Sequence, residues 1–245
     1  MEYHVLNGDA LNDRWPNRLK GKRIVFRECL IEGPFKAANL TEFFELRGSF
    51  LESHYSNEEN TFNYLEETVC ELKNLENASS TSAINLWFEE DLFCQANLWF
   101  LCHYLWTELT ISKAFWVRPQ FSSPYGFGAL DQEGLIAAYT NRSTFNTQDY
   151  AQLWYYYANE EFEKLLTQGE GLGDLSPFVL PAIKAHVAQQ PIEGFLGRPR
   201  ETLRQLKLKY GSDNFGLIFK EFSEIEAIYG FGDLQVRRMF KELDS

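Results

Sequence analysis

The sequence has few cysteines, and none of them has the spacing of a metal site or a disulfide framework. Its 245 residues include 4 cysteines, and no two of these form a Cys-x-x-Cys pair. They lie in apolar or mixed surroundings, at Cys29, Cys70, Cys94 and Cys102. This pattern favours buried thiols in a reducing compartment over a disulfide scaffold or a zinc site.

Long hydrophobic runs are missing as well. The most apolar stretch, ANLWFLCHYLW, contains Asn97 and His103 and is too short to cross a bilayer. The N-terminus carries Glu2, His4 and Asp9 where a secretory signal would need a basic start and an apolar run. We therefore expect a cytoplasmic protein that makes no contact with membranes.

Positive charge is in short supply. The formal net charge of -12 repels phosphate backbones, so nucleic acid is disfavoured as a partner of the whole chain. The last quarter, residues 181–245, is nearly neutral, and its helical patterns resemble a helix-turn-helix or winged-helix module. In that interpretation Arg237, Arg238 and Lys241 would contact phosphates. The neutral charge and the acidic remainder of the chain favour a purely structural helical unit instead.

Standard catalytic motifs are absent from the sequence. We find neither the GxGxxG fingerprint nor the P-loop pattern of nucleotide-binding proteins, and no GxSxG nucleophile elbow. The 4 histidines lie far apart, without HxxxH or HExxH spacing. The sequence thus names no reaction, no cofactor and no oligomeric state, and it leaves open whether the protein is an enzyme.

What the sequence does contain is an alternation of short apolar runs with helical patterns. Strands are predicted at residues 3–6, 23–29, 83–88 and 113–119. Helices are predicted between or after them at residues 10–19, 41–54, 58–75 and 91–107. Strands separated by helices indicate an α/β fold with a mainly parallel, Rossmann-like sheet flanked by helices.

The pattern changes after about residue 122, where strand signals almost vanish. Helices are predicted at residues 130–140, 147–166, 177–189, 200–210, 213–227 and 233–243. We therefore expect an α/β domain over residues 1–122 and a mostly helical region over residues 123–245. A sub-boundary is expected near residue 177, ahead of a C-terminal three-helix unit.

Polar residues gather where the predicted strands end. In an open parallel sheet the carboxyl ends of the strands share one edge, and ligands bind in the crevice there. The residues at these ends are Asn7, Gly8, Asp9, Arg27, Glu28, Glu32, Glu89, Glu90, Asp91, Gln95 and Arg118. Four of them are candidate catalytic groups because their carboxylates could exchange protons: Asp9, Glu28, Glu89 and Asp91.

The Asn-Gly-Asp stretch at the first strand end has two interpretations. Gly8 can supply the backbone angle of a turn, while the carboxylate of Asp9 caps the following helix. The same helix start could instead hold an anion. The carboxylate argues against a phosphate, because it would occupy the cap and repel a second anion.

The acids at the strand ends also allow more than one interpretation. Carboxylates from three strand ends could hold a magnesium-type cation, or two of them could share acid–base work. Alternatively, Arg27 and Arg118 pair with the acids and tie the strand ends together. We favour the arginine pairs over a metal and predict no metal site.

Four stretches of the sequence resemble the bacterial family known as domain of unknown function 1835. They are HVLNGDAL (4–11), VFRECLIEGP (25–34), WFEEDLFCQANL (87–98) and YGFGDLQVRRMFKEL (229–243), the last being similar to a companion C-terminal domain. The resemblance spans nearly the whole chain and implies no particular activity, substrate or cofactor. Its shared positions are His4, Asn7, Gly8, Asp9, Arg27, Glu28, Glu32, Gly33, Pro34, Trp87, Glu89, Asp91 and Gln95.

These positions largely coincide with the strand ends and add four residues, His4, Gly33, Pro34 and Trp87. The predicted ligand-binding set is therefore His4, Asn7, Gly8, Asp9, Arg27, Glu28, Glu32, Trp87, Glu89 and Gln95. We expect a protein that binds a small polar ligand at this edge, with or without catalysis. The alternative is a regulatory or adaptor protein whose C-terminal helices contact another protein or, as a weaker option, DNA.

Overall fold

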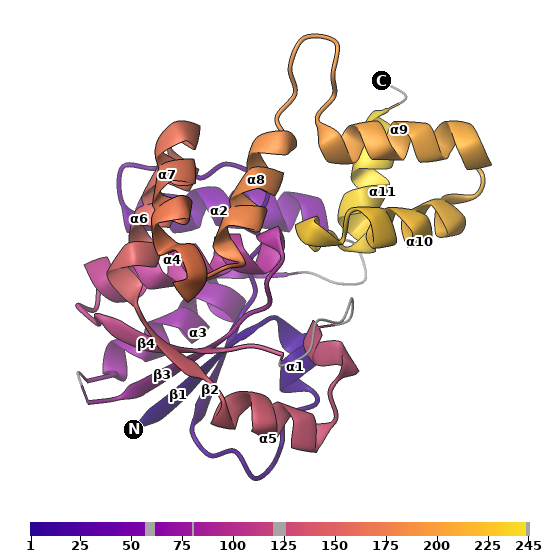
Figure 1. The fold of residues 1–245 in the computed structure, drawn as a ribbon. Helices are drawn as coiled ribbons and strands as arrows, with labels where there is room; N and C mark the ends of the chain where they lie inside the picture. Colours follow the sequence, from indigo (N-terminus) through magenta and orange to yellow (C-terminus); the bar gives the residue numbers. More distant parts are fainter. Residues whose placement is uncertain (57–61, 80, 120–125, 244–245) are drawn as a thin grey trace. The chain divides into compact units, whose positions relative to one another are not determined.

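The computed structural model describes residues 1–56, 62–79, 81–119 and 126–243. The chain forms two compact units. The first comprises Met1–Glu89 and Ala96–Glu161, and the second comprises Glu90–Gln95 and Phe162–Ser245. The first unit contains the sheet, whereas the second consists mainly of the helices nearest the C-terminus, which Figure 1 colours toward yellow.

The sheet of the first unit has five strands in the order β2-β1-β3-β4-β5. Four strands run parallel, β1 (Glu2–Asn7), β2 (Lys22–Phe26), β3 (Ala83–Trp87) and β4 (Lys113–Val117), while β5 (Ser143–Asn146) is antiparallel to β4. This confirms the predicted α/β fold with a mainly parallel sheet. The strand order reverses between β1 and β3, which makes that part of the carboxyl edge the topological switch point.

Helices cover both faces of the sheet, as Figure 1 shows. They are α1 (Asp9–Asn12), α2 (Leu40–Tyr55), α3 (Cys70–Lys73), α4 (Leu92–Thr107), α5 (Gln132–Thr140) and α6 (Thr147–Ala158). On one face, Leu6 and Trp87 belong to an apolar cluster with residues of α1 and α5. On the other, Phe100 of α4 stacks on Phe26 of β2, with 5.9 Å between the ring centres.

The first helix is shorter than predicted. A helix was expected over residues 10–19, but α1 ends at Asn12. Pro16 explains the difference, because its ring would clash with the carbonyl four residues earlier, that of Asn12. Trp15 and Leu19 still pack against the apolar cluster on this face, so the apolar spacing of the segment reflects its burial rather than a helix.

The sheet also recruits a strand from the part of the sequence expected to be helical. β5 was not predicted, and the boundary expected at residue 122 falls inside the first compact unit, which continues to Glu161. The single helix predicted over residues 147–166 is two helices, α6 and α7 (Phe162–Leu172). Glu160 lies between them with φ of 56°, a left-handed conformation that cannot continue a right-handed helix.

The connection from β2 to β3 ends in an irregular helical segment. Part of the helix predicted at residues 58–75 lies outside the described residues. From Leu65 onward the chain forms one π-helical segment, η1 (Leu65–Val69), then α3 and the 3-10 turn η2 (Asn74–Asn77). The hydroxyl of Thr68 in η1 donates to the carbonyl of Arg27 over 3.1 Å, so η1 lies beside the carboxyl end of β2.

The most apolar helix is α4, which contains Asn97 and His103. Among the described residues, no helix is long and apolar enough to span a membrane. Cys94 and Cys102 on this helix are buried, as is Cys29, but Cys70 on α3 is exposed. The expectation that all four thiols are buried is therefore wrong for Cys70.

The second unit contains the remaining helices. They are α7 (Phe162–Leu172), η4 (Gly173–Leu175), α8 (Val179–Ala188), α9 (Arg198–Tyr210), α10 (Phe215–Ile225), η5 (Ala227–Tyr229) and α11 (Asp233–Glu242). The last three α-helices share an apolar core formed by Leu203, Leu206, Ile218, Phe222, Val236, Met239 and Phe240. The predicted three-helix unit is thus present. It starts at Arg198 rather than near residue 177, because α8 packs against α7.

Candidate functional site

The Asn-Gly-Asp stretch after β1 is a turn, but its aspartate does not cap α1. Gly8 occupies the cap position with φ of 86°, and its N–H donates to the carbonyls of Leu6 and Phe26 over 3.0 and 3.1 Å. No side chain caps α1. The interpretation of Asp9 as the helix cap is therefore wrong, because its carboxylate pairs with Arg27 instead.

The pair between Asp9 and Arg27 is bidentate and partly open to solvent. Nε and Nη2 of Arg27 donate to the two carboxylate oxygens over 2.8 and 2.7 Å, and the side chains are 51% and 25% exposed for Asp9 and Arg27. The hydrogen bond to Asp9 raises the pKa of Arg27. Nη1 of Arg27 donates to the carbonyl of Glu67 over 2.7 Å. This confirms the predicted role of Arg27 as a tie between strand ends.

The neighbouring carboxylate, Glu28, is completely buried. It forms a second bidentate pair, in which Nε and Nη2 of Arg47 donate to its two oxygens over 3.0 and 2.8 Å. The N–H of Cys29 and the hydroxyl of Tyr64 donate to the same carboxylate over 2.7 and 2.8 Å. Glu28 accepts hydrogen bonds from four donor groups and has no exposed side-chain surface. It therefore joins the loop after β2 to α2 and does not face a ligand.

Arg47 was not among the predicted site residues. Its guanidinium also donates to the carbonyls of Cys29 and Glu32, over 2.8 and 2.7 Å, so one side chain fixes the loop that follows β2. Burial lowers its pKa, but the charge of Glu28, the hydrogen bonds to Glu28 and the charges of Cys29 and Tyr64 together outweigh burial, so the pKa is raised. A sequence signal existed: Arg47 lies four residues after Phe43 on α2, which places it on the buried face of the helix.

Glu32 lies at the end of the same loop and is half-buried. Its Oε1 accepts hydrogen bonds from the hydroxyl of Tyr55 and, over 3.5 Å, from Sγ of Cys29. Burial raises the pKa of the Cys29 thiol well above its ordinary value, which keeps the thiol protonated. These contacts make Glu32 part of the packing between the loop and α2.

Asn97 joins the ends of β1 and β2. Its Nδ2 donates to Oδ1 of Asn7 and to the carbonyl of Glu28, each over 2.8 Å, and its Oδ1 accepts from the N–H of Leu30 over 3.0 Å. The side chain is buried. The carboxyl edge near β1 is therefore fixed by a polar side chain that comes from α4.

His4 and Trp87 lie in the core, apart from the strand-end residues. The indole N–H of Trp87 donates to Nδ1 of His4 over 3.1 Å, so Nε2 carries the proton that binds the carbonyl of Lys20 at 3.0 Å. Both side chains are fully buried, and burial lowers the pKa of His4. His4 is thus a neutral core histidine with both ring nitrogens engaged.

The polar residues that follow β3 divide between the two units. Glu89, in the first unit, accepts a hydrogen bond from the N–H of Phe127 over 2.6 Å. Asp91, in the second, accepts from the N–H of Cys94 over 2.9 Å and so caps α4, while the side chain of Gln95 is buried. Burial raises the pKa of Asp91. Glu89 and Asp91 thus act as acceptors for backbone N–H groups.

The structure therefore brings Asp9 together with Arg27, and Glu28 with Arg47. Arg118, the other predicted partner of the acids, lies over the ring of Trp116, 5.8 Å from its centre. Because Asp9 and Glu28 are each neutralised by an arginine, these two acids are poor ligands for a divalent cation.

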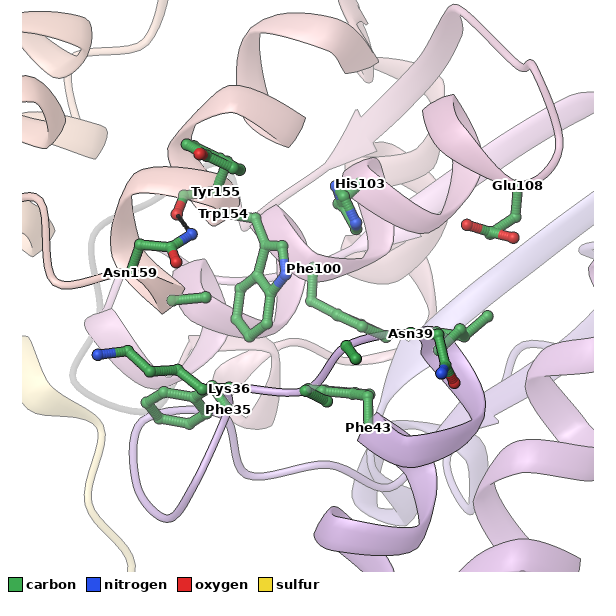
Figure 2. Close-up of a pocket in the computed structure, with 14 residues that line it drawn as sticks. Phe35, Lys36, Asn39, Phe43, Phe100, His103, Glu108, Trp154, Tyr155 and Asn159 are labelled. Carbon is green, nitrogen blue, oxygen red and sulfur yellow. Dashed lines mark hydrogen bonds between the residues drawn. The ribbon is translucent and has the colours of Figure 1, made fainter.

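The first unit contains a pocket that none of the predicted site residues lines. Its volume is about 500 Å³. We name it the Trp154 pocket; Figure 2 shows its lining, which comes from the segment before α2, from α2 itself, from α4 and from α6. The lining residues are Phe35, Lys36, Ala37, Ala38, Asn39, Leu40, Phe43, Phe100, His103, Glu108, Trp154, Tyr155, Ala158 and Asn159.

Four aromatic side chains give this pocket an angled wall. Phe43 and Phe100 are stacked, with 4.8 Å between ring centres and 19° between ring planes. Trp154 stands nearly perpendicular to both, at 88° and 77°, and Phe35 meets its edge at 71°. These rings form a rigid apolar surface of the kind that binds flat organic molecules.

Polar groups face the same space. Within the described residues, no hydrogen bond reaches the indole N–H of Trp154 or the imidazole of His103. Burial lowers the pKa of His103 from its ordinary value, against the opposing charge of Glu108, so the ring is neutral at pH 7. Lys36, at the rim, pairs with Glu160 over 3.2 Å. The pocket thus combines an apolar wall with two polar groups, the indole N–H of Trp154 and the imidazole of His103, that make no hydrogen bond within the described residues.

Sequence reasoning missed this pocket because its residues come from three separate segments. His103 was considered only as a histidine without a metal-binding partner. Comparison of the chain with protein-family models, curated proteins and solved structures found no match. The resemblance of the four sequence stretches to a known family therefore stays a prediction.

Proposed function

We propose that this protein binds a small organic molecule in the Trp154 pocket. The observation that carries the proposal is a cavity of about 500 Å³ with an aromatic wall and polar side chains around it. Binding sites for small molecules are usually preformed hollows of about 300–1,000 Å³ in which aromatic side chains and precisely placed polar groups line the space. The proposal keeps the small-ligand function expected from the sequence and moves it away from the carboxyl edge.

The contacts at the carboxyl edge support this relocation. The carboxylate of Glu28 is buried and accepts four hydrogen bonds, and Asp9 is held by Arg27. A ligand there would have to displace these pairs and leave charged groups without partners, which is costly for the buried one. In the Trp154 pocket, by contrast, the indole N–H of Trp154 and the imidazole of His103 have no hydrogen-bond partner to lose among the described residues.

The alternative role of the three-helix unit as a nucleic-acid contact has less support. Four of its cations are already in ion pairs: Arg198 with Glu226, Arg200 with Glu242, Arg204 with Glu201, and Lys209 with Glu221. Phosphates would compete with these carboxylates for the same groups. A cytoplasmic location and the family resemblance are part of the proposal, supported by the cysteine spacing and by the shared stretches.

Thermal-shift screening tests the proposal. The panel contains nucleotides, sugars, amino acids and aromatic heterocycles, and a ligand that binds only the folded protein raises its stability, by about 2.7 kcal/mol at one hundred times its Kd. Ala158→Phe places a ring inside the pocket and serves as the blocked variant. Ala137→Phe, at a half-buried position on α5 outside the pocket, serves as the matched control.

The expected result is a stabilising compound whose effect is kept by A137F and lost by A158F. A compound that stabilises A158F as strongly as the unchanged protein would place the site elsewhere. A panel in which nothing stabilises the protein would also count against the proposal.

A further inference from the structure

We infer that the ligand of the Trp154 pocket is an uncharged, flat heteroaromatic compound whose ring carries a hydrogen-bond acceptor for the indole N–H of Trp154. This inference rests on the proposed function and specifies its ligand class. It follows from the shape of the aromatic wall, from the indole N–H and the imidazole that make no hydrogen bond within the described residues, and from the charges around the pocket.

The wall sets the shape of the ligand. The parallel rings of Phe43 and Phe100 and the perpendicular ring of Trp154 form a corner, as Figure 2 shows. A flat molecule can lie along one side of this corner and meet the other with its edge, and both contacts are favourable between aromatic rings. A puckered ring, such as a sugar, would touch the corner at fewer atoms.

The indole N–H sets the requirement for an acceptor. Trp154 is only 5% exposed and lines the pocket, and within the described residues no hydrogen bond reaches its Nε1. An indole nitrogen can only donate, so the ligand atom that satisfies it must be an acceptor. In Figure 2 this nitrogen lies on the side of the indole that faces His103. The neutral imidazole of His103 can then donate to, or accept from, a second polar atom of the same ligand.

The start of α2 does not favour an anion. Oδ1 of Asn39 accepts from the N–H of Glu42 over 3.0 Å, and a carboxylate oxygen of Glu42 accepts from the N–H of Ala38 over 2.8 Å. These contacts occupy the helix start with an internal carboxylate, which would repel a negatively charged ligand.

The other charges near the pocket point the same way. Lys36 is paired with Glu160, and Glu108 adds a carboxylate to the lining. The whole chain carries a formal charge of -12, which further disfavours an anion. A cation could pair with the carboxylate of Glu108 in the lining, but a purely cationic group offers no acceptor to the indole N–H of Trp154, so the uncharged ligand fits the described groups best.

Three matched probes test this inference: benzimidazole, indole and benzimidazole-5-carboxylate. The first two have the same size and shape, but only benzimidazole has a ring nitrogen that accepts a hydrogen bond, and the third adds a negative charge. Binding at pH 7.5 is followed by ¹H–¹⁵N spectra of the indole groups of the unchanged full-length protein. The peak of Trp154 is assigned by its absence from Trp154→Phe.

Benzimidazole is expected to shift the Trp154 indole peak and to bind about three- to tenfold more tightly than indole, the value of one hydrogen bond. The carboxylate probe is expected to bind more weakly than benzimidazole. W154F is expected to reduce the affinity for benzimidazole more than the affinity for indole, so that the two probes bind the variant about equally. Residual binding of indole to W154F shows that the variant still has a pocket.

Equal affinities of the unchanged protein for benzimidazole and indole would overturn the inference, and so would tighter binding of the carboxylate probe. These outcomes do not require W154F to fold, because they are measured on the unchanged protein. If none of the three probes binds, but A158F abolishes the binding of another compound, the proposed function stands and the inference fails. If A158F changes the binding of no compound, the proposed function itself fails.

Discussion

Breaking the buried pair of Glu28 and Arg47 is expected to destabilise the first unit far more than breaking the exposed pair of Asp9 and Arg27. Both pairs are bidentate, with donor–acceptor distances of 2.7 to 3.0 Å. They differ in exposure: both side chains of the first pair are 0% exposed, against 51% and 25% in the second. Burial, with the additional hydrogen bonds that the buried groups make, is therefore the difference that the comparison tests.

The substitutions are Glu28→Gln and Arg47→Met, with Asp9→Asn as the control. Each of the first two leaves a charged group buried without its partner, which costs about 3–5 kcal/mol. Asp9→Asn removes a solvent-exposed partner, and the expected loss is about 0.2–1 kcal/mol. The double variant Glu28→Gln/Arg47→Met buries no net charge, so it is expected to lose less than the sum of the two single variants.

Urea unfolding followed by tryptophan fluorescence measures these losses in the first unit alone. All six tryptophans belong to that unit: Trp15, Trp87, Trp99, Trp106, Trp116 and Trp154. At a slope of about 2 kcal/mol per molar urea, a loss of 4 kcal/mol lowers the midpoint by about 2 M. A loss below about 1 kcal/mol in Glu28→Gln or Arg47→Met, or an equal loss in Asp9→Asn, would refute the reasoning from burial.

Three further predictions concern other parts of the chain. Burial lowers the pKa of His186 to about 4, so the second unit is expected to have its full stability above pH 6.5 and to lose roughly 3 kcal/mol as the pH falls to 4, because between these values the unfolded chain binds the proton more readily than the folded chain. NMR titration of the imidazole and far-UV circular dichroism of His186→Gln check this prediction. An imidazole that titrates near pH 6.5 contradicts it. Gly8 and Gly197 share φ values of 86° and 87°, but a Cβ at Gly8 meets nothing within 4 Å, whereas one at Gly197 would lie 2.1 Å from a backbone carbonyl at the end of α8. Gly8→Ala is thus expected to cost about 1–3 kcal/mol from backbone strain, and Gly197→Ala clearly more; equal losses in thermal unfolding would contradict the clash. Asn39→Ala removes the cap of α2 and is expected to lower the free energy of unfolding by about 1 kcal/mol. Asn39→Asp keeps an acceptor for the N–H of Glu42 and is expected to lower it less. Urea unfolding compares the two variants.

Local patterns were sufficient to predict the parallel strands and most helices. A strand such as β1 is a short run whose apolar side chains are buried, and this property can be recognised without knowledge of its neighbours. β5 escaped prediction because it is a short edge strand with largely exposed side chains, so it lacks the apolar signal of the central strands. Its place in the sheet depends on pairing with β4, which lies far away in the sequence.

The candidate site was predicted in part. The sequence indicated that Arg27 could pair with an acid at a strand end, and the pair with Asp9 confirms this. It did not indicate the partner of Glu28, because Glu28 lies in the loop after β2 and Arg47 lies on α2, 19 residues further along the chain. Nor did the sequence show that His4 lies in the core and not with the strand-end residues of the predicted binding set. That distinction depends on the tertiary structure, in which the imidazole of His4 accepts a hydrogen bond from Trp87.

The sequence by itself determined the α/β class, the shared carboxyl edge of the parallel strands and the three-helix unit. Each of these follows from periodic burial or chain polarity, which short segments encode on their own. Only the tertiary structure decided which acids are buried and paired, and where a hollow remains. The Trp154 pocket exists because side chains from the start of α2, from α4 and from α6 meet around it, and such a meeting depends on how distant segments pack.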